Sequence, residues 1–137
     1  MSDRIESEAE VKTYLDRLRY ALDAGATIQF QEDRGVDIDR EPQYTNRYTV
    51  EELFPNEDVV SALKRELRTL TVNNYIRTVP DTRFPKRSDW REFGKTYECT
   101  KEIYIKLRVE LLGMSVVFVM SFHHSTIPFS ETIFPYA

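Results

Sequence analysis

The side chains best suited to acid–base and phosphate chemistry are gathered in the second half of the chain. They are Arg77, Arg91, Tyr104, Lys106, Arg108 and His123. Cutting RNA without a metal requires a base that takes the proton of the 2′-hydroxyl, cations that stabilise the dianionic phosphorane, and an acid that protonates the leaving oxygen. Histidine, tyrosine, lysine and arginine supply all three functions. The alternative is that Tyr104, Lys106 and Arg108 form only the solvent face of an amphipathic strand, with His123 a residue at a strand end.

The spacing of these residues predicts a β-hairpin over 101–124. Apolar and polar residues alternate through 103–109, which is the period of a strand with one buried face. Residues 116–122 are apolar at almost every position, as in a strand that is covered on both sides. With a turn at 111–113, the hairpin would place the tyrosine and two of the cations on one exposed face. The two histidines of the chain would lie at the end of the neighbouring strand.

The sequence predicts neither a metal site nor a cofactor site. His123 and His124 are consecutive, and consecutive side chains of a strand point to opposite faces, so the pair cannot easily bind one ion. The chain contains no HExxH or CxxC motif and no glycine-rich phosphate loop. Cys99 has no base near it in the sequence, so we interpret it as a loop residue rather than a nucleophile.

The rest of the chain must supply the elements that position the hairpin. Ser7 and Glu10 form a capping-box pair at the start of a helix predicted over 7–24, which Gly25 ends. Segment 32–46 is polar, lacks a period and is unusually long for a loop of a compact domain, so we expect it to be mobile or to form a contact surface.

Further elements complete the predicted fold. They are an edge strand over 26–31, a helical turn starting at Thr49, a helix capped by Asn56, an ambiguous segment over 70–78, and a strand over 90–97 interrupted at Gly94. Two reliable helices followed by a run of antiparallel strands predict an α+β domain.

Length and composition are consistent with one domain over 1–137, with a core at about 7–129 and a C-terminal tail at 130–137. The chain has 137 residues, 41% of them hydrophobic, and one cysteine, so no internal disulfide is predicted. We see neither a signal segment nor a long uncharged run, so we expect a cytoplasmic protein without a membrane partner.

Positive charge is concentrated in one part of an acidic chain. The formal net charge is −4, yet residues 77–108 carry 9 basic and 5 acidic side chains. The overall balance argues against non-specific nucleic-acid binding by the whole molecule, whereas the basic segment is suited to a local contact with phosphates. The alternative is random clustering of charges on a solvated surface.

Four segments in their order resemble a known family. They are LTVNNYIRT (70–78), DWREFG (89–94), KEIYIKLRV (101–109) and VMSFHH (119–124). Together they are similar to the MqsR-like (motility quorum-sensing regulator) toxins, which are RelE-fold messenger-RNA endoribonucleases of type II toxin–antitoxin systems. The resemblance covers roughly residues 10–129 and is most specific in EIYIKL and SFHH.

The resemblance implies a RelE-like architecture, in which helices pack on one face of a curved, mainly antiparallel sheet and RNA binds the other. It also implies catalytic roles for Arg77 as the phosphate-binding cation, for Tyr104 as the catalytic tyrosine, and for His123. Arg77 stands where the family has lysine, and an arginine keeps the charge but cannot donate a proton near neutral pH. The residues expected to bind RNA are Lys86, Arg87, Arg91, Lys106 and Arg108. The aromatic residues expected to stack on bases, or else to pack in the core, are Tyr75, Trp90, Phe93 and Tyr97.

Three functional hypotheses follow. The first is a toxin that cleaves mRNA without a metal, arrests translation and is held inactive by a cognate antitoxin protein. The second is a non-enzymatic binding or inhibitor protein of the same fold that has lost the nuclease chemistry. The third is a partner-binding module whose tail forms an exposed apolar patch. That patch would consist of Ile127, Phe129, Ile133, Phe134 and Tyr136.

Overall fold

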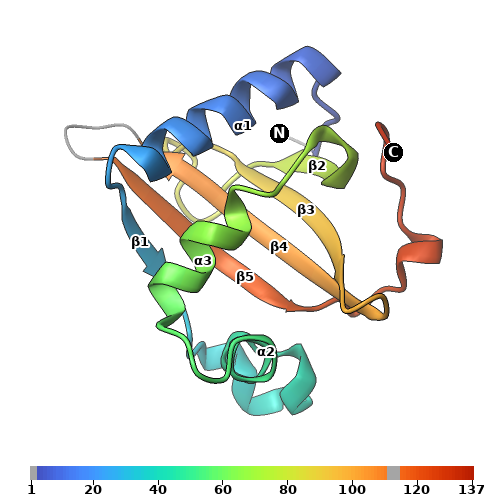
Figure 1. Ribbon diagram of the computed structural model, residues 1–137. Helices are drawn as coiled ribbons and strands as arrows, with labels where there is room; N and C mark the ends of the chain where they lie inside the picture. Colours follow the sequence, from blue (N-terminus) through green and yellow to red (C-terminus); the bar gives the residue numbers. More distant parts are fainter. Residues whose placement is uncertain (1–2, 111–114) are drawn as a thin grey trace.

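The computed structural model of the chain describes residues 3–110 and 115–137, which form an α+β fold (Figure 1). Within these residues there are three α-helices and five strands. The helices are α1 (Glu8–Asp23), α2 (Asn46–Leu53) and α3 (Val59–Leu67). The strands are β1 (Thr27–Phe30), β2 (Tyr75–Val79), β3 (Trp90–Tyr97), β4 (Lys101–Glu110) and β5 (Val116–His124).

The strands form one mixed sheet in the order β1-β5-β4-β3-β2. Strands β2 to β5 pair antiparallel with their neighbours, and β1 pairs parallel with β5 at the sheet edge. The predicted hairpin is confirmed: β4 and β5 are neighbours, and Tyr104 lies opposite His123. The turn predicted at 111–113 lies outside the described residues.

Helix α1 begins as the sequence predicts. The Ser7 hydroxyl accepts a hydrogen bond from the Glu10 amide (3.1 Å), and the Glu10 carboxylate accepts one from the Ser7 amide (3.0 Å). Gly25 follows the helix with a φ of 84°, a left-handed conformation that glycine adopts without a steric penalty. The chain then turns directly into β1.

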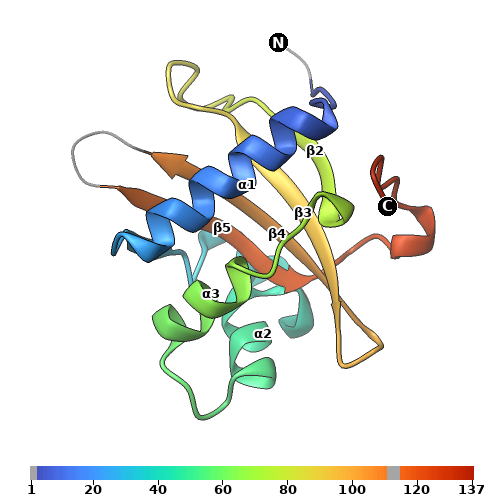
Figure 2. The same ribbon diagram turned by 45° about the horizontal axis from the view of Figure 1, so that its top comes forward.

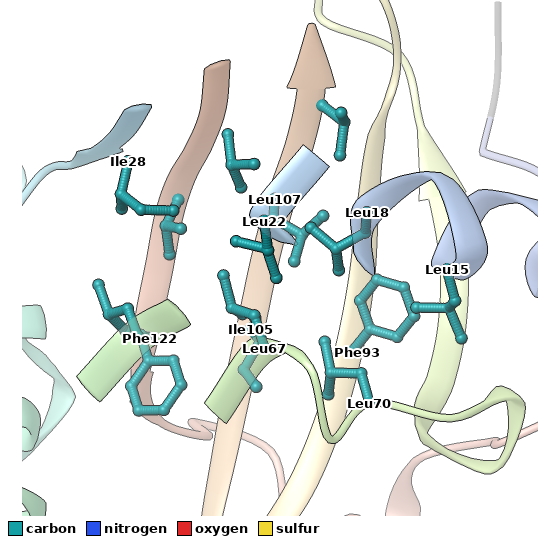
Figure 3. Packing of buried hydrophobic residues seen from close by; sticks show 14 of the residues in the cluster. Leu15, Leu18, Leu22, Ile28, Leu67, Leu70, Phe93, Ile105, Leu107 and Phe122 are labelled. Atoms are coloured by element: carbon teal, nitrogen blue, oxygen red, sulfur yellow. The ribbon is translucent and has the colours of Figure 1, made fainter. Parts of the chain in front are cut away.

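The hydrophobic core lies between α1, α3 and one face of the sheet (Figure 3). Leu18 of α1 and Leu63 of α3 are completely buried, and the alternating apolar residues of β4 point toward them. Figure 2 shows both helices crossing the same face of the sheet. We call this surface the helix face and the opposite surface of the sheet the open face. Since alternate side chains of a strand point to opposite faces, the polar residues of β4 lie on the open face.

Several element boundaries differ from the predictions. Helix α3 is capped by Asp58, whose carboxylate accepts from the Ser61 amide (3.0 Å), rather than by Asn56. Strand β3 continues through Gly94 without interruption. The ambiguous segment 70–78 divides into a short 3₁₀ turn and β2.

Two irregular segments border the open face. Segment 32–46 contains two short 3₁₀ turns and is anchored by Asn46, whose side-chain amide donates to the backbone oxygens of Gln31 (2.6 Å) and Met120 (2.9 Å). The same side chain accepts from the Phe122 amide (2.9 Å). One buried asparagine therefore ties this loop to β5.

The C-terminal tail packs on the fold rather than forming a single exposed patch. Its rings Phe129 and Phe134 meet edge to face and lie over Gly94, where an added Cβ would come within 2.8 and 2.9 Å of them. Tyr136 stacks on Tyr75. Two other apolar residues remain exposed, Ile127 and Ile133. The five residues therefore do not form one exposed patch, because the three aromatic members are partly buried and pack on one another and on Tyr75.

Candidate functional site

A groove of about 690 Å³ lies on the open face of the sheet. Its walls come from Arg34 and Arg40 on one side and from residues 125–135 of the tail on the other. Strand register sets its floor, because Glu92 lies opposite Lys106 and Lys106 opposite Ser121. The polar side chains of the floor are Arg77, Glu92, Tyr104, Lys106, Ser121 and His123. The structure thus brings together the three residues predicted to be catalytic and one predicted RNA-binding residue.

His123 is almost completely buried in the floor of the groove. Its Nδ1 lies 2.8 Å from the backbone oxygen of His124. A carbonyl oxygen can only accept, so Nδ1 carries the proton, and the neutral ring keeps its lone pair on Nε2. Burial lowers the pKa of His123, and the nearby charges of Arg40 and Arg34 lower it further against the opposing effect of the hydrogen bond. His123 is therefore a neutral base at neutral pH.

Tyr104 lies beside His123, with 5.6 Å between the two ring centroids. Burial raises the pKa of Tyr104, and the Glu92 carboxylate raises it further, whereas Arg77 and Arg34 oppose the change. The phenol consequently keeps its proton throughout the neutral range. It can donate a hydrogen bond or a proton close to the histidine.

Lys106 is a half-buried cation on the floor of the groove. Its ammonium group forms no hydrogen bond or ion pair with any of the described residues, and its Nζ lies 5.8 Å from the centroid of the Trp90 ring. Burial lowers its pKa, the charge of Glu92 on the neighbouring strand opposes this change, and the charges of Arg34 and Arg77 lower the pKa further. A charge that is removed from water without a partner is costly, so this lysine is poised to bind an anion.

Arg77 lies at the edge of the groove and is already paired. It donates from Nε to Glu92 (2.9 Å) and from Nη1 to Asp3 (2.9 Å). The hydrogen bond to Glu92 raises its pKa. The cation that the resemblance assigns to phosphate binding is therefore partly neutralised by the protein itself.

Several residues of the groove were missed from the sequence, among them Arg34, Arg40 and Glu92. Arg34 and Arg40 come from the long loop at 32–46, in which apolar residues follow no regular spacing. No signal in the sequence indicated which face of the sheet that loop covers. The Arg34 guanidinium donates no hydrogen bond to the described residues, and Arg40 reaches only the Tyr44 oxygen at 3.4 Å. Glu92 could have been found, because it alternates with Trp90 along a predicted strand and therefore shares its face.

The prediction that Arg91 shares a face with Arg77 is wrong. Arg91 lies on the helix face, where it donates to both oxygens of Glu6 (2.9 and 3.2 Å) and stacks over the Tyr14 ring at 4.1 Å. The reason is strand alternation. Arg77 lies opposite Glu92 and Thr78 opposite Arg91, so the two arginines must point to opposite sides of the sheet.

Arg108 is on the predicted face but is not accessible. Only 2% of its surface is exposed, and its Nη1 donates to Asp81 at 2.7 Å. Its guanidinium lies between the rings of Trp90 (4.1 Å) and Phe118 (5.2 Å). Its first role is thus to attach the β2–β3 loop to the sheet.

The remaining predicted cations, Lys86 and Arg87, are exposed on the β2–β3 loop at 80–89 and do not line the groove. Arg87 stacks over the Phe84 ring at 4.3 Å. Of the aromatic residues predicted to stack on bases, Tyr75 and Phe93 are completely buried in the core. Those two residues therefore pack in the core, which was the alternative to stacking on bases.

Metal-ligating side chains do not cluster in the described part of the chain. No group of three or more histidine, cysteine, aspartate or glutamate residues that could hold an ion occurs there. The two histidines diverge as expected, since His124 turns from the groove to contact Glu52 of α2 at 2.7 Å. Among residues 3–110 and 115–137 no helix has the length and apolarity needed to cross a membrane.

Comparisons with known proteins found no similar protein. No protein-family model, no curated protein and no solved structure matches the chain. The fold class is α+β, and the function must be argued from the groove.

Proposed function

We propose that this protein is an endoribonuclease that cleaves mRNA without a metal ion. The observation that carries the proposal is the pairing of His123 and Tyr104 on the floor of a groove that Lys106, Arg34 and Arg40 line, and none of these cations forms an ion pair with the described residues. A neutral imidazole, a protonated phenol and unpaired positive charges are the groups that metal-free cleavage of a phosphodiester requires.

In the proposed reaction, His123 Nε2 takes the proton of a 2′-hydroxyl, and the resulting oxygen attacks the adjacent phosphorus. Lys106, Arg34 and Arg40 stabilise the additional negative charge of the phosphorane. The bond from phosphorus to the 5′-oxygen then breaks, and Tyr104 donates to that oxygen. The products are a 2′,3′-cyclic phosphate and a 5′-hydroxyl, so no metal-bound water is needed.

The biological role that we propose is that of a toxin in a type II toxin–antitoxin system. The resemblance of EIYIKL and SFHH to MqsR-like toxins supports this role, because both segments supply the floor of the groove. The role implies cytoplasmic action on mRNA, a RelE-like fold and a cognate antitoxin protein as partner.

The alternative function is a binding or inhibitor protein that has lost the nuclease chemistry. The specific observation in its favour is Arg77, whose pairing with Glu92 and Asp3 neutralises the cation expected to contact the scissile phosphate. Such a protein would bind RNA or another anionic partner in the same groove and leave it intact.

The test is an RNA cleavage assay with the purified chain in the presence of a chelator. We expect single-stranded RNA to be cut to products with 2′,3′-cyclic phosphate ends at an unchanged rate, and we expect growth of a bacterium to stop when the chain is induced. Stable binding without cutting would favour the alternative function. Cleavage that the chelator abolishes and a divalent ion restores would contradict the proposed mechanism.

A further inference from the structure

A second hollow of about 580 Å³ lies on the same open face, beside the groove. It is formed by the β2–β3 loop, the end of β1 and the neighbouring parts of β3, β4 and β5. The two depressions share Met120 as a lining residue. They are thus neighbouring compartments of one continuous surface.

Stacked rings and guanidinium groups line this second hollow. Arg108 lies between Trp90 and Phe118 at its base, and Arg87 covers one side of Phe84 at its rim. Phe84 is 47% exposed, so part of its ring is accessible to a ligand. Aromatic and guanidinium planes are the surfaces on which proteins stack unpaired nucleic-acid bases.

The loop that carries Phe84 is held in place rather than free. One oxygen of Asp81 accepts from the amides of Arg83 and Phe84 (both 3.1 Å), and the other accepts from the buried Arg108 (2.7 Å). The carboxylate therefore joins the loop backbone to the sheet. A ring on such a loop can offer a stacking surface without losing much conformational entropy on binding.

Lys106 connects the two compartments. It lines the groove, and its ammonium lies 5.8 Å from the Trp90 ring, which lines the hollow. Along β4, Tyr104 and Arg108 are four residues apart, so the reacting groups and the hollow are separated by about 13 Å. A strand whose backbone passes over Lys106 would bring a nucleotide further along the strand to the hollow.

We propose that this hollow binds an unpaired base of the RNA strand whose phosphate lies in the groove, with Phe84 as the main stacking surface. The inference rests on the proposed function, because it takes RNA to be the occupant of the groove. It adds a substrate class, namely single-stranded rather than paired RNA. It also adds a base-contacting residue outside the predicted set.

The test measures binding, so that it does not depend on cleavage. A short 2′-O-methyl RNA, which lacks the attacking hydroxyl, is compared with a fully abasic strand of the same length and charge by fluorescence anisotropy. Stacking of one base is worth a factor of about 5 to 150 in affinity. The wild-type chain should bind the strand with bases more tightly by a factor in this range, and Phe84→Ala should remove most of the difference.

Two control variants make the result specific. Tyr20→Ala removes another exposed aromatic ring, 71% exposed on α1 and therefore on the helix face, and should leave the difference unchanged. Lys106→Ala should weaken both strands by the same factor, because it removes a phosphate contact. Circular dichroism should show that Phe84→Ala is folded, since nearly half of that ring is already in water.

The outcomes separate this inference from the proposed function. Base-dependent binding that Phe84→Ala removes, without cutting of ordinary RNA, would support the hollow and overturn the nuclease. If the chain cuts RNA but Phe84→Ala does not change the affinity difference between the two strands, the nuclease function would be supported and the base-binding role of the hollow would be contradicted. Absence of binding to either strand would overturn both.

Discussion

Arg91 on the helix face and Lys106 on the open face are both shielded cations, and they differ in their partners. On the helix face, Arg91 and Glu6 share two hydrogen bonds, and the arginine stacks on Tyr14. On the open face, Lys106 and Arg34 form no hydrogen bond with any described residue. A buried charge is retained at low cost only when it is paired. Arg77 and Arg108 of the open face are also paired, with Glu92 and Asp3 and with Asp81. The difference therefore concerns Lys106 and Arg34, whose charges are left for a ligand.

The largest expected effect comes from the reacting group of the open face. His123→Ala should lower the rate of RNA cleavage about 10²–10⁴-fold, because it removes the general base. Binding of an uncleavable RNA and the circular dichroism spectrum should change little. His124→Ala is the matched control, since that ring leaves the groove for Glu52, and it should stay active. Equal losses in both variants would mean that neither histidine acts as the base.

The next effect tests the helix face. Arg91→Ala should lower the free energy of unfolding by about 3 kcal/mol, because it leaves the Glu6 carboxylate buried without its partner. Arg68→Ala removes an exposed pair with Asp23 and should cost less than about 1 kcal/mol. Denaturant unfolding measures both changes. If Arg91→Ala were as stable as Arg68→Ala, the contrast between Arg91 and Lys106 would fail.

The same ion pair has a predicted pH dependence. Burial raises the pKa of Glu6, but hydrogen bonds from Arg91 and Thr78 outweigh it, so its pKa in the folded protein lies below 4.5. Its contribution to stability is therefore present above pH 4.5 and is lost as the pH falls through the folded pKa. In Glu6→Gln, denaturant unfolding between neutral and acidic pH should show a smaller loss of stability than in the wild type.

A smaller effect is expected from the unpaired lysine. Lys106→Ala should weaken RNA binding and reduce the slope of log affinity against log salt by about 0.7, the value for one phosphate contact to a single strand. Its stability should be equal to or above that of the wild type, because no hydrogen bond or ion pair with the described residues is lost. Arg17→Ala, an exposed cation on α1, should leave both the affinity and the slope unchanged.

The regular spacing of apolar residues was sufficient to predict the helix and the hairpin that position the site. Helix α1 and the β4–β5 hairpin have regular apolar patterns, so their buried faces followed directly, and the positions of Tyr104 and His123 with them. The error at Arg91 arose from grouping cations by their closeness in the sequence. Consecutive side chains of a strand point to opposite faces, so placing Trp90 on the open face would have placed Arg91 on the helix face.

The walls of the groove could not be predicted from the same signals. Segment 32–46 has no period, and its position depends on Asn46, which reaches Met120 across 74 residues of sequence. The tail is held by aromatic rings that fit only because residue 94 is a glycine. Both arrangements depend on tertiary contacts between distant segments. Arg34 and Arg40 therefore became visible as site residues only in the folded chain.

The most direct test of the central claim is the pH dependence of RNA cleavage. With His123 as a buried neutral base, kcat/KM should rise with pH through a pKa below 6.5 and stay level through neutrality. Arg40→Ala removes one charge that lowers this pKa, so its rising limb should move to higher pH, and in His123→Ala the limb should disappear. A midpoint at or above 6.5 in the wild type, or an unchanged limb in His123→Ala, would contradict the account.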